Sequence, residues 1–180
     1  MKFRFILLNA AILLTFFSAV RAADIKDLFL KMPSEIVKDI DRNKAIAGAS
    51  VENSLLKLNF PKDFSGEFKI LAEKKDETVI GFSVYSCAES ELEIWSVKKG
   101  NWKNITGSAA PKLGAKDVAE MLKVSPATVE KLDKDVSLSY FFTFATDENQ
   151  MKLVIRKQAV CDIAGTVYEY QFNGRKFIKN

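Results

Sequence analysis

The sequence contains no histidine and only two cysteines, Cys87 and Cys161. Histidine is the commonest general base at neutral pH and a frequent metal ligand, so its absence excludes Ser-His-Asp and Cys-His catalysis and every histidine-ligated metal site. Two cysteines cannot complete a tetrahedral metal site by themselves. We therefore expect a protein without a catalytic residue of these classes, without a metal and without a cofactor.

Long hydrophobic runs are also scarce, because the chain has one, Phe5 to Phe17. It is too short to span a bilayer. It follows the basic residues Lys2 and Arg4 and ends near small residues, which is typical of a secretory signal peptide cleaved between Ala22 and Ala23. Residues 1–22 should thus be removed, leaving a mature protein in the periplasm or outside the cell, with no transmembrane span.

A cluster of charges of one sign is likewise missing. Removal of residues 1–22 takes away Lys2, Arg4 and Arg21, which leaves basic and acidic residues almost in balance. A nucleic-acid partner requires a basic patch or stripe, and the sequence offers none. We expect no nucleic-acid partner. An envelope or secreted protein is a possible partner, and the sequence leaves its identity and the oligomeric state open.

What the sequence does contain is an internal similarity. The segment from Thr78 to Cys87, followed by Trp95, returns as Leu153 to Cys161, followed by Tyr170. Lys26-Asp27 and Lys116-Asp117 each precede a helical pattern. A tandem repeat is therefore predicted, with one copy in residues 23–107 and the other in residues 108–180.

Hydrophobic periodicity gives each copy the same contents. A helical pattern interrupted at Pro33 predicts two short helices in the first copy, and a second helix pair is expected in residues 118–132. About four strands follow in each copy, with hairpin turns at Gly100 and Gly174. In one strand Phe68 and Ile70 alternate with Glu67 and Lys69, which predicts a half-buried strand. The expected fold class is α+β, each half packing two short helices on a roughly four-stranded antiparallel sheet.

The cysteines occupy equivalent positions in the two copies. Export delivers cysteines to an oxidising compartment, which favours a disulfide over a reactive or metal-binding thiol. If a pseudo-twofold axis relates the copies, equivalent residues can meet only close to that axis. We predict a Cys87–Cys161 bridge that joins one repeat to the other.

Two resemblances follow from these features. Asp24 to Pro33 directly after the signal peptide, the Val79 to Cys87 strand, Cys87-Ala-Glu-Ser and the stretch from Trp95 to Trp102 resemble the secreted bacterial family catalogued as domain of unknown function 3256. That resemblance implies an envelope or secreted location and supplies no activity. More loosely, two copies of a helix pair and a four-stranded sheet look like β-lactamase inhibitory protein, which implies a sheet surface that grips another protein.

The remaining candidates for function are aromatic and acidic residues. Tyr85 and Trp95 are expected on the sheet face away from the helices, where large side chains make good interface anchors. The alternative is that other parts of the protein cover them. We predict a non-catalytic binding or protein-interaction module of the cell envelope. A hydrolase that uses the carboxylate pair Glu91 and Glu93, or a purely structural envelope component, is the competing interpretation.

Overall fold

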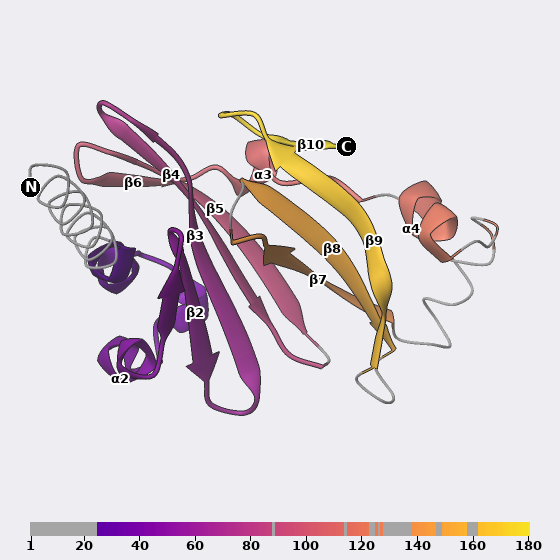
Figure 1. The fold of residues 1–180 in the computed structure, drawn as a ribbon, viewed down its shortest axis with the longest axis horizontal. Coiled ribbons are helices and arrows are strands. Elements are labelled where there is room, and N and C mark those ends of the chain that lie inside the picture. The colour runs from indigo at the N-terminus through magenta and orange to yellow at the C-terminus, as the bar shows by residue number, and fades with distance from the viewer. Residues whose placement is uncertain are drawn as a thin grey trace, which may run out of the picture.

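The computed structural model describes residues 25–87, 89–113, 115–122, 125, 127, 138–146, 149–157 and 162–180. The predicted signal peptide with its Ala22/Ala23 cleavage point lies outside the described residues, as do Cys161 and most of the second helix expected in the second half. Within the described residues the protein is of the α+β class, with two antiparallel sheets and a few short helices (Figure 1). No helix among them is long and apolar enough to cross a membrane.

The first sheet, sheet A, is an antiparallel meander in which every strand pairs with the next one along the chain. Its six strands are β1 (Ser50–Glu52), β2 (Leu55–Phe60), β3 (Phe64–Lys74), β4 (Glu77–Tyr85), β5 (Ser90–Lys98) and β6 (Asn101–Asn104). The predicted turn between β5 and β6 is confirmed, since Lys99 and Gly100 adopt positive φ angles of 51° and 81°. Such angles are typical of tight hairpin turns.

The second sheet, sheet B, is a four-stranded meander of the same kind. It comprises β7 (Leu138–Phe144), β8 (Gln150–Lys157), β9 (Asp162–Phe172) and β10 (Phe177–Lys179). The Asn173-Gly174 turn predicted from the sequence connects β9 to β10, and Gly174 has a φ of 89°. Strand prediction from alternation therefore succeeded in both halves.

Short helices precede the strands in each half. A helix at 25–31 ends before Pro33, as predicted, and is followed by η1 (Glu35–Val37), a turn of 3₁₀ helix, and α2 (Arg42–Ala47). Ser34 and Asp41 cap η1 and α2 by accepting hydrogen bonds from backbone N–H groups. α3 (Thr106–Ala109) lies across the predicted boundary between the halves, and α4 (Ala115–Leu122) belongs to the second half.

The N-terminal helices cover one face of sheet A. Ile25, Phe29 and Met32 are fully or almost fully buried against this face, where Phe29 meets Phe68 edge to face with ring centroids 5.6 Å apart. Three consecutive strands contribute the side chains beneath them: Leu56, Leu58, Phe60, Phe68, Ile70, Ile80, Phe82 and Val84. This first core belongs wholly to the first half of the chain.

Sheet B covers the opposite face of sheet A, as Figure 1 shows. A second core forms between the sheets and takes Leu55, Leu71, Val79 and Ile94 from sheet A. From sheet B it takes Phe142, Phe144, Met151, Leu153, Tyr170, Phe172 and Phe177. Both halves of the chain supply this core. Sheet A therefore packs on the face of sheet B where the repeat hypothesis predicts a pair of helices.

Strand β7 lies at the edge of sheet B and touches sheet A along its unpaired side. Ser83 Oγ donates to the carbonyl of Phe142 at 2.6 Å, Ser90 Oγ to that of Tyr140, and Lys69 Nζ to that of Thr146 at 2.7 Å. An unpaired strand edge is costly when buried and prone to wrong pairing when exposed. Side chains of sheet A therefore take the place of a further strand along β7.

The roughly equal halves expected from the sequence are not seen. Sheet A has six strands and sheet B has four, so the additional strands β1 and β2 have no counterpart among the described residues of the second half. The coarse class was predicted correctly, and the part of the chain that the structure describes shows no tandem repeat of helices packed on a sheet.

Candidate functional site

Tyr85 and Trp95 do not share a face of sheet A. In the register of β4 and β5, Ile80 lies opposite Trp95, whereas Tyr85 lies opposite Ser90. Trp95 therefore points to the same side as Ile80, beneath the N-terminal helices, and Tyr85 points to sheet B. The prediction of one aromatic face carrying both residues is wrong.

The surroundings of Trp95 leave little of its ring exposed to a partner, and Tyr85 is partly covered. Trp95 is 8% exposed, and it packs edge to face on Trp102 with ring centroids 6.1 Å apart. Its Nε1 donates to Glu93 Oε2 at 2.9 Å. Tyr85 is half-buried and stacks on Phe141 with centroids 4.3 Å apart. Other parts of the protein thus cover most of Trp95 and part of Tyr85, as the alternative interpretation predicted.

The carboxylates of the alternative hydrolase, Glu91 and Glu93, do lie on one face of β5, two residues apart. Their environments differ, because Glu93 accepts a hydrogen bond from the Trp95 indole, whereas Glu91 is exposed and lines a cleft. The sequence pattern thus found a residue of the cleft, although it did not find the cleft.

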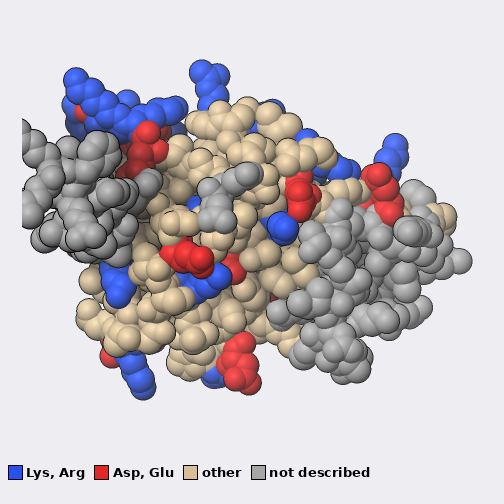
Figure 2. Space-filling view, viewed as in Figure 1, with Lys and Arg blue, Asp and Glu red and all other residues tan. Residues whose placement is uncertain are grey.

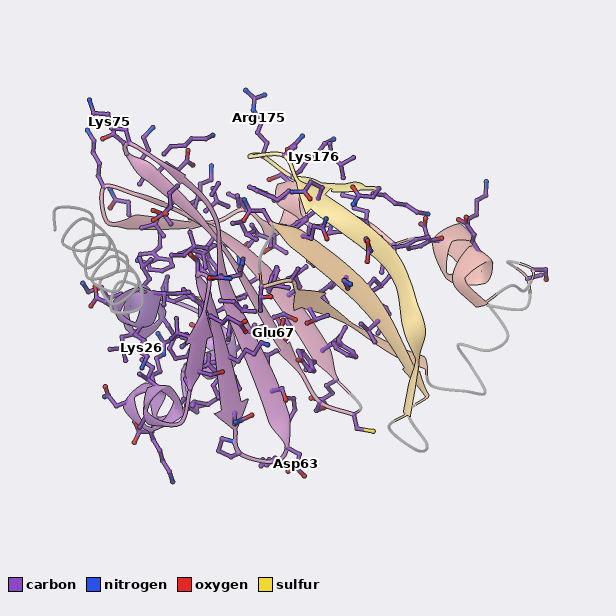
Figure 3. The ribbon with its side chains drawn as sticks, viewed as in Figure 1. Lys26, Asp63, Glu67, Lys75, Arg175 and Lys176 are labelled. Atoms are coloured by element: carbon purple, nitrogen blue, oxygen red, sulfur yellow. The ribbon has the colours of Figure 1, made fainter. Side chains whose placement is uncertain are left out.

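That cleft lies at the end of sheet A where β2 turns into β3 and β4 leads into β5. It has a volume of about 470 Å³, within the range of ligand sites in proteins. Three separate parts of the chain form its walls, namely 36–40 around η1, the turn at 60–64, and Val84 with 89–91. Asp63, labelled in Figure 3, marks the tip of the β2–β3 turn beside it.

Apolar side chains form the floor of the cleft: Ile36, Ile40, Phe60, Phe64 and Val84. Phe60 and Val84 are buried members of the first core, while Ile36, Ile40 and Phe64 are only partly covered. The floor is therefore an opening in the first core, held in place by the helices and sheet A behind it. A second hollow of about 420 Å³ adjoins it and shares Ile40 and Pro61.

Charged residues form the rim. Three carboxylates, Asp39, Glu89 and Glu91, are exposed there together with one cation, Lys62. Local structure positions two of the rim's segments. Lys62 has a φ of 62° at the β2–β3 turn, and the Glu89 backbone N–H donates to the side-chain oxygen Ser86 Oγ at 3.2 Å. The cleft is apolar at its base and predominantly negative at its mouth.

Lysines gather at the opposite end of sheet A. Lys74 and Lys75 lie at the β3–β4 turn, and Lys98 and Lys99 lie at the adjoining β5–β6 turn. Figure 2 shows this group of basic residues at the upper left of the molecule, and Figure 3 labels Lys75 there. The acidic residues Glu73, Asp76 and Glu77 are interspersed among them, so this end is of mixed charge.

A buried polar cluster joins the two sheets at the centre of the molecule, where Figure 3 labels Glu67. The Glu67 carboxylate is 6% exposed and accepts hydrogen bonds from Phe144 N at 2.6 Å, Thr143 Oγ1 at 2.8 Å and Tyr85 OH at 3.1 Å. These partners lie on sheet A and sheet B. With its carboxylate enclosed by protein donors, Glu67 is better placed to hold the sheets together than to meet a ligand.

Cys87 lies two residues after the end of β4, between the cleft residues Val84 and Glu89 in the sequence, and is disulfide-bonded. The other cysteine of the chain, Cys161, lies outside the described residues, so the pairing of the two stays a prediction. Over the part of the chain that the structure describes, no group of histidine, cysteine or acidic residues could hold a metal ion.

No protein-family model matches this chain, and no curated protein or solved structure is significantly similar to it. The resemblances to domain of unknown function 3256 and to β-lactamase inhibitory protein accordingly stay predictions.

Proposed function

We propose that this chain is an exported, non-catalytic binding protein whose ligand site is the apolar cleft between η1 and the β2–β3 and β4–β5 turns. The observation that carries the proposal is the partly uncovered floor of Ile36, Ile40 and Phe64. Apolar side chains gathered in a concave, preformed site gain free energy when a ligand displaces water from them.

Two further features support the exported part of the proposal. The predicted signal peptide would carry the chain out of the cytoplasm, and the disulfide at Cys87 would persist in an oxidising compartment. The envelope, as periplasm or cell exterior, is the proposed location.

The tandem repeat is retained as a proposal about origin. Both β4–β5–β6 and β8–β9–β10 are antiparallel meanders whose last two strands are joined by a turn with a positive-φ glycine. A common ancestor of the two halves would account for this likeness, with β1 and β2 added to the first.

The proposal is tested by titrating the isotopically labelled protein, in its exported and oxidised form, with a set of small apolar fragments. Amide signals of residues 36–40, 60–64 and 84–91 should shift together, and Ile40→Glu should abolish the shifts while leaving the rest of the spectrum in place. Leu30→Glu, at an exposed helical position outside the cleft, is the matched control. Shifts confined to other surfaces, or none at all, would contradict the proposal.

One observation favours the alternative hydrolase, namely that Glu91 lines the cleft. Retaining and inverting glycosidases both need two carboxylates that flank the substrate. Glu93, however, is engaged by Trp95, so only Glu91 of the pair is placed for this role. Hydrolysis of any member of a glycan panel that Glu91→Gln eliminates would favour the enzyme over the binding protein.

A further inference from the structure

We infer that the cleft binds a peptide segment in which a large apolar side chain is flanked by lysine or arginine. This inference rests on the proposed function, because it names the ligand class of the same site. The charge of the rim, the composition of the floor and the shape of the two adjoining hollows all favour such a ligand.

The rim carries more negative than positive charge. Asp39, Glu89 and Glu91 line the cleft, and none of the three takes part in a salt bridge with another described residue. Lys62 is the one cation among the residues lining it. A cationic ligand gains attraction from such a rim, whereas an anionic ligand is repelled by it.

The apolar floor favours a ligand that carries an apolar group in addition to its positive charge. Phe60 and Phe64 pair with each other across the β2–β3 turn, and Ile36 and Ile40 face them from the helical segment. A bare cation would remain hydrated and would leave these side chains in contact with water. An isoleucine, leucine or phenylalanine side chain would cover them.

The shape favours a segment of chain. The second hollow continues from the first across Ile40 and Pro61, and its walls include Asp41, Lys44 and Asn59. Polar groups along such a groove can hydrogen-bond a peptide backbone, while the apolar floor selects a side chain. An extended peptide can occupy both hollows at once.

The experiment uses labelled peptides that share one apolar core, Ile-Phe-Leu, and differ in their flanking residues, which are lysine, glutamine or glutamate. Binding to the oxidised, exported protein is followed by fluorescence anisotropy at low and at high salt. The lysine peptide should bind about tenfold more tightly than the glutamine peptide at low salt, and the difference should shrink at high salt.

The variant protein Asp39→Asn/Glu91→Gln should lower the affinity for the lysine peptide about tenfold and leave the glutamine peptide unaffected. Asp76→Asn/Glu52→Gln removes the same charge from exposed positions outside the cleft and should change neither affinity. Both double variants are nearly isosteric at exposed sites, so an unchanged amide spectrum will show that the fold is intact.

The possible failures are distinguishable. Equal binding of lysine and glutamine peptides that Ile40→Glu abolishes would overturn the inference about charge and leave the cleft as the binding site. Failure of all three peptides together with a silent fragment titration would overturn the proposed function as well. Concentration-dependent changes at the cleft residues, matched by dimers in sedimentation, would replace the peptide with a second copy of this chain.

Discussion

The buried carboxylate of Glu67 gives the sharpest test of how the two sheets are held together. It lies on β3 of sheet A and accepts hydrogen bonds from Phe144 N and Thr143 Oγ1 of β7, and from Tyr85 OH of β4. Glu67→Ala would remove the acceptor for all three donors at a site that is largely shielded from solvent. Such a change should loosen the edge of sheet B nearest to sheet A.

The expected cost follows from these contacts. A buried backbone N–H without a partner costs about 1–3 kcal/mol, and each of the two hydroxyl hydrogen bonds contributes about 1 kcal/mol. The free energy of unfolding should therefore fall by roughly 3–5 kcal/mol, a large part of the 5–15 kcal/mol that is typical of proteins. Glu67→Gln keeps one acceptor oxygen and should cost about half as much.

Urea denaturation of the oxidised protein measures this quantity. With a slope of about 2 kcal/mol per molar urea, the midpoint for Glu67→Ala should fall by roughly 1.5–2.5 M. Glu91→Gln, an exposed carboxylate on the same sheet, should move it very little. If Glu67→Ala lowered the free energy of unfolding by less than about 1 kcal/mol, the carboxylate would not be a link between the sheets.

The other predictions concern packing, covalent linkage and pH. Gly81→Ala should destabilise the protein by about 1–3 kcal/mol, because a Cβ atom there would lie 2.5 Å from Phe144 Cζ, and Phe144→Leu should relieve part of the loss in a double-mutant cycle; additive losses would contradict the contact. Cys87→Ser should lower the free energy of unfolding by about 4 kcal/mol if the bridge closes the long loop predicted above, and peptide mapping should find Cys87 joined to the other cysteine. The hydrogen bond from Tyr168 OH, together with Lys179, lowers the pKa of Glu120, so this carboxylate stabilises the attachment of α4 above the ordinary glutamate pKa of 4.5. That stabilisation should be lost as the pH falls through the lowered value, seen as faster hydrogen exchange in α4, and Tyr168→Phe should weaken the pH dependence, leaving the part that Lys179 supplies.

Several features of this protein could be predicted from its sequence because they depend on neighbours along the chain. Alternating apolar residues predicted the strands, Pro33 ended the first helix, and the glycines at 100 and 174 marked hairpin turns. These signals are local, since backbone geometry and side-chain direction repeat with a period of a few residues. The α+β class followed from them.

The burial of charged residues on β3 could not be predicted from local sequence patterns. Glu67 and Lys69 alternate with Phe68 and Ile70, which predicted a strand with only one face buried. In the structure both charged residues are buried, at 6% and 2% exposure, because sheet B covers the second face. Nothing within β3 indicates that covering layer, which is contributed by residues more than sixty positions further along the chain.

The tertiary structure alone decided which residues could meet a ligand. The pairing of β4 with β5 placed Trp95 beside Ile80 and separated it from Tyr85, because a shift of one residue in register exchanges the two faces of a strand. The cleft likewise unites three parts of the chain that the sequence keeps apart, 36–40, 60–64, and Val84 with 89–91. The sequence by itself determined the strands and turns through local periodicity, whereas long-range pairing and packing determined the faces, the buried Glu67 and the cleft.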